Sequence, residues 1–254
     1  METQSPELKR NTAWLLRDKY PGHFTGNFFY DMCRIKMGEP IDYVIGWIPF
    51  LGCRIDLSLK PFIPRSETEY WVKQAIDGIN LRFGGKPLRM LDIFAGSGCI
   101  GIAALKHLSN IWLDFVEKNE QYIPQIQKNL VLNHIDSTRT NVIQSDIFEN
   151  IHGNYDVIFA NPPYVPLARR STVAHSVCEY EPLTAVFGGT DGLDVIRRFL
   201  REARLYLNPE GIIWMEFDSP EKDKINQLVE ESGYSRCEFL RDQFGEWRTL
   251  KIVV

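Results

Sequence analysis

The residues of this chain most suited to chemistry are four consecutive ones, Asn161-Pro162-Pro163-Tyr164, which follow the apolar run 156–160. That run is β-prone and predicts a strand buried in a sheet. Two consecutive prolines cannot continue a hydrogen-bonded ladder, so they predict a rigid turn directly after the strand. One side-chain amide and one aromatic ring would therefore be held at the end of a strand, where open α/β sheets bind ligands.

Asn161 and Tyr164 suit chemistry on a planar nitrogen. The side-chain oxygen of Asn161 and the backbone carbonyls beside the prolines can accept hydrogen bonds from an –NH2 group. Such a nitrogen is a weak nucleophile because its lone pair is delocalised, and holding both N–H bonds would turn that lone pair toward an electrophile. Tyr164 would stack on the planar substrate or lie beside a nitrogen that becomes positive. The alternative for this segment alone is a strand-ending turn with a surface tyrosine.

A loop of small residues and two acids indicate which electrophile is used. The loop 94–98 lies between a predicted strand and a predicted helix, where small residues let a ligand approach the backbone. Glu117 would accept hydrogen bonds from ribose hydroxyls, and Asp146 from an adenine amino group, with Ile147 against the ring. We expect no Lys or Arg for a pyrophosphate here, so a nucleoside without phosphate fits better. S-adenosylmethionine is such a ligand, and its sulfonium methyl group is the electrophile that Asn161 would need.

The elements that must position these residues alternate between strand and helix after residue 87. We expect strands at 88–93, 111–117, 141–146, 156–160 and 212–217, helices at 99–108, 121–133, 192–207 and 219–233, and a closing pair of strands at 237–240 and 248–254. Asp191 would cap the helix 192–207. This alternation predicts an α/β fold with a parallel sheet and helices on both faces.

The first third of the chain predicts a small appendage. One helix would run from Ser5, as N-cap, to about Tyr20, and a second from Phe28 to Met37. Residues 38–57 predict a β-hairpin, because two apolar runs are separated by glycines. A loop at 61–69 then leads into a helix.

Composition excludes several classes of protein. The 254 residues carry a formal charge of −4, which is unfavourable for broad nucleic-acid binding. Five scattered cysteines without a CxxC pair, and five scattered histidines, predict neither disulfides nor a metal site. The chain has no apolar run of membrane-spanning length and no signal-peptide core at its start. We expect a cytoplasmic protein, a monomer, without a membrane segment or a stable nucleic-acid partner.

Taken together, these motifs resemble the HemK-type family, the glutamine methyltransferases of peptide chain release factors. The resemblance runs from about Gly38 to Val254 and rests on the segments Gly38 to Gly46, Ile63-Pro-Arg-Ser-Glu-Thr-Glu69, Asn161-Pro-Pro-Tyr164, Glu179-Tyr-Glu-Pro182, Phe187-Gly-Gly-Thr-Asp-Gly-Leu193 and Phe244-Gly-Glu-Trp-Arg248.

The resemblance implies a Rossmann-like class I methyltransferase sheet, mostly parallel and seven-stranded, in residues 61–254. A short helical segment for substrate recognition (1–37) and a β-hairpin linker (38–60) would precede it. The activity implied is methyl transfer from S-adenosylmethionine to the glutamine amide of the Gly-Gly-Gln loop of a release factor, leaving S-adenosylhomocysteine. Contacts with the cofactor are implied for Phe94, Ala95, Gly96, Ser97, Gly98, Glu117, Ile147 and Asn161, beside the expected Asp146. Asn161, Pro162, Pro163 and Tyr164 would hold the glutamine, with Asn161, Pro162 and Tyr164 catalytic.

The sequence departs from the family pattern in four places. Ser66 replaces a proline, and Phe94-Ala95 replaces a Gly-Thr pair, which makes the loop look more like that of ribosomal RNA guanine methyltransferases. The N-terminal segment is short, and the glutamine that the family places after Glu216 is absent.

Three alternative functions remain open at the level of sequence. One is methylation of a ribosomal-protein glutamine, because close relatives share these motifs. Another is methylation of an exocyclic amine on RNA or DNA, which Arg169-Arg170 favours. A third is a cofactor-binding scaffold without catalysis.

Overall fold

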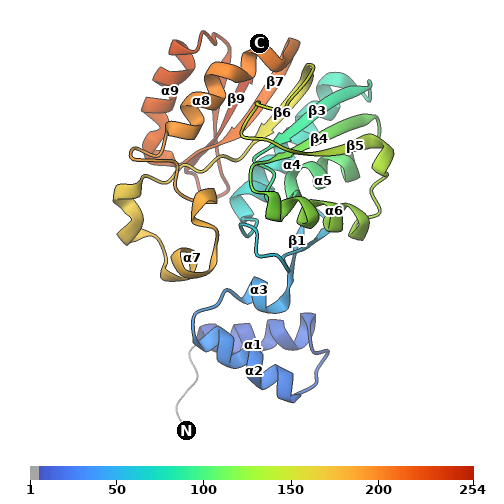
Figure 1. Cartoon of the computed structure of the whole chain (residues 1–254), viewed down its shortest axis with the longest axis vertical. Coiled ribbons are helices and arrows are strands. Elements are labelled where there is room, and N and C mark those ends of the chain that lie inside the picture. The colour runs from blue at the N-terminus through green and yellow to red at the C-terminus, as the bar shows by residue number, and fades with distance from the viewer. Residues whose placement is uncertain (1–5) are drawn as a thin grey trace.

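A computed structural model of the chain describes residues 6–254 and shows a seven-stranded sheet with helices on both faces (Figure 1). The strands lie in the order β5-β4-β3-β6-β7-β9-β8. Their bounds are β3 Leu88–Ile93, β4 Ile111–Glu117, β5 Thr140–Gln144, β6 Tyr155–Ala160, β7 Leu207–Glu216, β8 Cys237–Arg241 and β9 Trp247–Val253. β9 is antiparallel to β7 and β8, and the other neighbours are parallel. The predicted Rossmann-like α/β fold is therefore confirmed.

Alternation along the strands explains why both faces of the sheet are covered. The core around the sheet consists of two apolar clusters, one on each face of the sheet. On β3, Met90 belongs to one cluster and its neighbour Leu91 to the other, and both are fully buried. The first cluster contains the helices α4 Ser66–Phe83, α5 Cys99–His107 and α6 Ile123–Leu132, and the second contains α8 Asp194–Ala203 and α9 Lys222–Glu231. Successive side chains of a strand point to opposite faces, so a parallel sheet between two helical layers needs such continuous apolar runs.

The N-terminal part forms a small helical unit below the sheet in Figure 1. Helices α1 (Pro6–Asp18) and α2 (Gly26–Lys36) pack through Leu15 and Phe28, together with Val44. Asp31 adds polar ties, because it accepts hydrogen bonds from Lys19, Tyr20 and Arg34 at 2.7–2.8 Å. The predicted N-cap Ser5 lies outside the described residues. Among residues 6–254, no helix combines the length and apolar character needed to cross a membrane.

The prediction of a hairpin over residues 38–57 is wrong in its first half. Residues Ile41–Ile45 form the short helix α3, and the hairpin is confined to β1 (Trp47–Phe50) and β2 (Cys53–Asp56). The helix ends at Gly46, whose φ of 93° lets its N–H donate to Asp42 O at 2.8 Å. These five residues, of which only Asp42 is charged, are too few to show a periodicity that distinguishes helix from strand. Packing decides here, since Val44 joins the small helical core.

The predicted helix 192–207 is also too long. Helix α8 covers 194–203 and passes through a 3-10 turn into β7, which begins at Leu207 rather than at 212. Asp191 accepts a hydrogen bond from Leu193 N–H at 3.0 Å, so it stabilises the turn before the helix rather than capping it. Between the fourth parallel strand and α8, a short helix α7 (His175–Tyr180) was not predicted.

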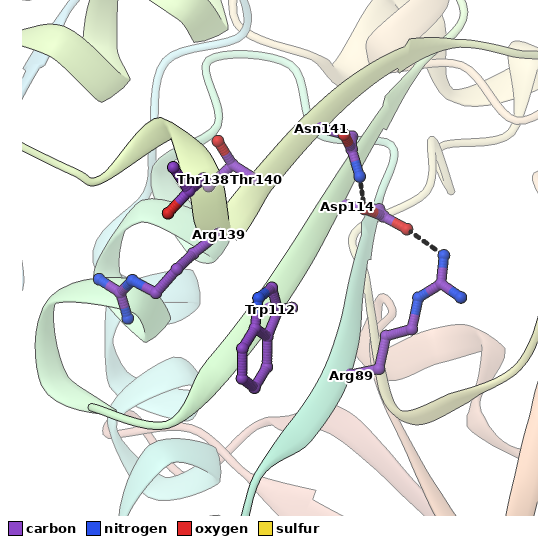
Figure 2. Close-up of a pocket in the computed structure, with 7 residues that line it drawn as sticks. All are labelled: Arg89, Trp112, Asp114, Thr138, Arg139, Thr140 and Asn141. Atoms are coloured by element: carbon purple, nitrogen blue, oxygen red, sulfur yellow. Dashed lines mark hydrogen bonds and ion pairs between the residues drawn. The ribbon is translucent and has the colours of Figure 1, made fainter.

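At the amino ends of the parallel strands, one buried carboxylate joins four strands. Asp114 Oδ1 accepts from Asn141 Nδ2 at 2.7 Å, and its Oδ2 accepts from Arg89 Nη2 at 3.0 Å and Tyr155 OH at 2.8 Å. Figure 2 shows Asp114 between Asn141 and Arg89, in the wall of a cavity of about 330 Å³. Both oxygens of Asp114 thus accept hydrogen bonds from protein side chains. The cluster therefore has a structural role, at the end of the strands opposite the predicted site.

Candidate active site

A cavity of about 690 Å³ lies at the carboxyl ends of β3, β4, β5 and β6, and we call it the main cavity. It brings together most of the residues that the sequence analysis selected: Phe94, Ala95, Gly96, Ser97, Glu117, Asp146, Ile147, Asn161, Pro162, Pro163 and Tyr164. Gly98 is not on its wall. Gly98 is instead the N-cap of α5, with a φ of 80°, and its N–H donates to Ala95 O at 2.7 Å.

The loop after β3 needs left-handed backbone at its first position. Phe94 has a φ of 67°, a backbone conformation that favours glycine. This agrees with the glycine that the family pattern of the sequence analysis has at this position. Its ring packs edge-on against Phe199, with centroids 5.9 Å apart. Gly96 also has a positive φ, and a Cβ built on it would meet no atom within 4 Å. The backbone at Gly96 is therefore open to close approach by a ligand.

Glu117 connects this loop to the end of β4. Its Oε2 accepts from Gly96 N–H at 2.9 Å and its Oε1 from Asn119 N–H at 2.7 Å. Burial raises the pKa of Glu117, while these backbone N–H groups act in the opposite direction. Each carboxylate oxygen keeps further acceptor capacity, so the side chain is oriented by the backbone and can still accept a pair of hydroxyl groups.

Asp146 is held by two cations that the sequence analysis missed. Its Oδ2 accepts from Lys118 Nζ at 3.0 Å and Arg198 Nη1 at 3.2 Å. Burial acts to raise the pKa of Asp146, but these two partners lower it overall. Lys118 and Arg198 both line the main cavity, where the sequence analysis expected no Lys or Arg for a pyrophosphate. Both cations share the charge of Asp146, and Arg198 Nη2 also lies 3.9 Å from Glu149 Oε1, so two carboxylates balance the two cations here.

The Asn-Pro-Pro-Tyr segment begins directly after β6 and is held from two sides. Asn161 Nδ2 donates to Thr68 Oγ1 at 3.4 Å, and Tyr164 OH donates to Glu216 Oε1 at 3.1 Å. Burial, with the nearby Glu216 charge, raises the pKa of Tyr164 well above its usual value. The tyrosine is therefore a neutral phenol that donates a hydrogen bond. Thr68 and Glu216 were not selected from the sequence, although Glu216 is an acid at a strand end like Glu117.

The glycine-rich segment 187–193 supports the motif from behind. A Cβ on Gly188 would overlap Pro163 O, and a Cβ on Gly192 would overlap Tyr164 O. The two backbones also pair directly, because Gly188 N–H donates to Val165 O at 3.0 Å. Glycine is therefore required for backbone-to-backbone packing, which fixes the carbonyl groups of the motif.

Two further segments meet across the mouth of the main cavity. Glu181 is 5% exposed, and its Oε2 accepts from Ile63 N–H at 3.0 Å. Its other oxygen pairs with Arg65 Nη2. Arg65 lines the cavity, so this ion pair connects the loop before α4 to the segment that follows α7.

The residues present fit a nucleoside cofactor with a reactive methyl group. The backbone at Gly96 leaves room for a ribose, and the oriented Glu117 carboxylate can accept hydrogen bonds from its hydroxyl groups. Ile147 lines the cavity with an apolar side chain that is itself 2% exposed. A volume of about 690 Å³ is sufficient for a ligand of this size together with a side chain that enters from solvent. Among residues 6–254, no group of three or more His, Cys, Asp or Glu side chains is arranged to hold a metal ion.

Comparison with known proteins agrees with this geometry. A family model described as "Methyltransferase small domain" matches residues 82–180. A ribosomal protein L11 methylase from Lactobacillus delbrueckii subsp. bulgaricus has a TM-score of 0.56 at 18% identity, over 76% of this chain and 80% of that protein. At this identity the structural likeness concerns the fold alone.

Two relatives are more informative. A release factor glutamine methyltransferase from Flavobacterium psychrophilum is 31% identical over 252 residues, which cover 98% of this chain and 84% of the relative. A ribosomal protein uL3 glutamine methyltransferase from Francisella tularensis subsp. tularensis is 31% identical over 192 residues, or 72% of this chain and 58% of the relative. The chain is an S-adenosylmethionine-dependent methyltransferase, and it belongs to the release factor glutamine methyltransferase family.

Proposed function

We propose that this enzyme methylates the side-chain amide of the glutamine in the Gly-Gly-Gln loop of a peptide chain release factor. The observation that carries the proposal is the orientation of Asn161 at the main cavity. Its –NH2 group is directed to Thr68, so its carbonyl oxygen remains as an acceptor for an incoming N–H. We expect the enzyme to act as a monomer in the cytoplasm, without stable nucleic-acid binding.

In this proposal Asn161 and the Pro162 carbonyl each accept one N–H of the substrate amide. The nitrogen lone pair then points toward the methyl group that S-adenosylmethionine supplies when bound. S-adenosylmethionine would supply the methyl group and leave as S-adenosylhomocysteine, and the methylated nitrogen, now acidic, would release its proton to water. Tyr164 packs against the planar amide, and its hydroxyl is held by Glu216. Catalysis therefore comes from positioning and fixed dipoles rather than from a general base.

A ribosomal-protein glutamine is the second candidate substrate, because a uL3 glutamine methyltransferase is among the relatives. The same amide frame would serve either acceptor. Methylation of RNA is less favoured than the sequence suggested. Arg169 Nη1 pairs with Asp218 at 2.8 Å and lies 3.6 Å from Glu221 Oε2, so its charge is directed to the protein.

The N-terminal helical segment would recognise the protein substrate. Phe24, Phe29 and Tyr30 are 59–68% exposed on and before α2, while the neighbouring Phe28 forms the core. Tyr180 OH, at the end of α7, donates to Met37 O at 3.2 Å, and α7 also contributes Val177 to the wall of the main cavity. This exposed aromatic surface is thus connected through α7 to the mouth of the site.

Transfer of labelled methyl from S-adenosylmethionine to a purified release factor tests the function. A release factor whose Gly-Gly-Gln glutamine is replaced by alanine is the matched control, and ribosomal protein uL3 and ribosomal RNA are offered in parallel. Label on the wild-type factor alone would support the proposal. Label on uL3 or on RNA, with none on the factor, would overturn it.

A double substitution, Phe29→Ser with Tyr30→Ser, tests the recognition segment. Both side chains are exposed, so the fold should remain, while the KM for the protein substrate should rise about tenfold or more with unchanged affinity for S-adenosylhomocysteine. Leu81→Ser is the control, because Leu81 is 88% exposed at the far end of α4. An unchanged KM would show that this surface does not contact the substrate.

A further inference from the structure

Glu216 collects three hydrogen bonds behind the active site. It ends β7, is 2% exposed, and lies against α4 and the Asn-Pro-Pro-Tyr segment. Its Oε2 accepts from Thr68 Oγ1 at 2.6 Å and Trp71 Nε1 at 2.7 Å. Its Oε1 accepts from Tyr164 OH at 3.1 Å. A buried carboxylate needs such donors, and here all three come from elements that border the main cavity.

The direction of the hydrogen bond at Thr68 follows from its neighbours. The Trp71 indole N–H can only donate, and an ionised Glu216 carboxylate has no proton to give, so its Oε2 accepts from both Trp71 and Thr68. Thr68 has one hydroxyl proton, and the 2.6 Å contact with Oε2 uses it. The hydroxyl oxygen can then offer only a lone pair to Asn161, 3.4 Å away. That lone pair selects the –NH2 group of Asn161 as its partner.

We propose that Glu216 and Thr68 are positioning residues that hold the Asn161 side chain in the one orientation able to accept a substrate N–H. An amide that rotated by half a turn would present its –NH2 group to the substrate, and two donors would face each other. The chain from Glu216 through Thr68 to Asn161 prevents this rotation. The same carboxylate fixes the hydroxyl of Tyr164, so one buried group sets both polar side chains of the motif. This inference rests on the proposed use of Asn161 as an acceptor.

The test is a set of substitutions at Thr68 with a matched neighbour. Thr68→Val keeps the shape but removes the hydroxyl, and kcat should fall at least about tenfold, with little change in the affinity for S-adenosylhomocysteine. Thr68→Ser restores the hydroxyl and should recover activity to within about threefold of wild type. Trp71→Phe removes another donor to the same oxygen without touching Asn161, so it should lower the urea midpoint more than kcat.

A spectroscopic measurement separates positioning from general stability. In wild type, the Asn161 side-chain N–H that donates to Thr68 should exchange with water more slowly than in Thr68→Val, as followed by nuclear magnetic resonance of the selectively labelled protein. Equal exchange rates would overturn the proposal. So would a Thr68→Val enzyme with wild-type kcat, or equal losses of kcat in the Thr68→Val and Trp71→Phe enzymes.

Substitutions at Glu216 test the direction of the hydrogen bonds that Thr68 and Trp71 donate to it. In Glu216→Gln, the side-chain oxygen should take the position that accepts from Thr68 and Trp71, leaving the –NH2 group toward Tyr164. This variant should therefore keep more activity than Glu216→Ala, and a Gln variant no better than the Ala variant would overturn the proposal. All variants are compared on whichever substrate the wild-type enzyme labels. Failure of the proposed function would appear instead as an unlabelled release factor with the wild-type enzyme.

Discussion

At the scale of single residues, Asn161 carries the largest expected effect. Asn161→Ala removes the oxygen that would accept one substrate N–H, and it leaves the backbone of the motif in place. We expect kcat to fall on the order of 10²-fold or more, with most of the cofactor affinity retained. Steady-state kinetics beside calorimetric binding of S-adenosylhomocysteine measures the two effects separately. Near-normal turnover would exclude Asn161 from the mechanism.

Some residues of the candidate site could be predicted from the sequence and others could not. Asn161, Glu117 and Asp146 could be selected because each lies at the end of a predicted strand or directly after it, and the carboxyl ends of parallel strands lie together at one side of a sheet. Thr68 could not, because its partner Glu216 lies 148 positions away, and no local pattern indicates such a contact. Lys118 and Arg198 were missed for the same reason, since Arg198 reaches Asp146 from a helix 52 positions further along the chain.

At the scale of elements, the segment 187–193 is expected to control the geometry of the motif. Gly188→Ala would push a methyl group against Pro163 O, so the backbone that carries the proposed substrate acceptors must move. Because a small misplacement of reacting groups is costly, kcat should fall by about tenfold to a hundredfold, with a smaller loss of thermal stability. Gly78→Ala in α4 is the matched control, since a Cβ there would make only an ordinary contact of 3.8 Å with Trp214.

The comparison of the two glycine variants is made by kcat and by thermal unfolding in the same buffer. If Gly188→Ala unfolded like wild type and turned over at the wild-type rate, the packing of this segment would have no influence on the site.

Periodicity predicted most helices and strands, but the role of these glycines required the positions of both backbones. The helical Ile41–Ile45 illustrates the same limit, because its conformation depends on Val44 reaching a core built by α1 and α2.

At the scale of the whole molecule, the Asp114 cluster and the candidate active site lie at opposite ends of the parallel strands. Asp114 joins β3, β4, β5 and β6 at their amino ends, and it is 4% exposed. Asp114→Asn removes the charge that pairs with Arg89, and an Asn oxygen that still accepts from Arg89 and Tyr155 would turn its –NH2 group toward the donating –NH2 of Asn141. We expect the free energy of unfolding to fall by about 2–3 kcal/mol. Because the site lies at the other end of the strands, kcat below the unfolding temperature should stay within about twofold of wild type, and a normal urea midpoint would contradict this role.

The pH dependence of folding stability should report on Asp92, the last residue but one of β3, which lies just before the loop 94–98. Burial, opposed by the Gly101 N–H and reinforced by the charge of Glu117, raises the pKa of Asp92 from 3.8 to about 7. Its Oδ1 has no hydrogen-bond partner among the described residues, which is consistent with a carboxyl group that resists ionisation. The folded protein therefore keeps this proton at pH values where the unfolded chain has lost it.

The sign of the effect follows from this difference in proton binding. Between about pH 4 and pH 7 the native state binds more protons than the unfolded state, so the contribution of Asp92 to stability is full at low pH and is lost as the pH rises. Asp92→Asn cannot ionise and should lack this component. Urea unfolding at about pH 5 and pH 8 should therefore show wild type losing stability relative to Asp92→Asn as the pH increases. An equal difference between the two proteins at both pH values would mean that Asp92 is already ionised in the folded protein, and that the end of β3 tolerates a buried negative charge beside Glu117.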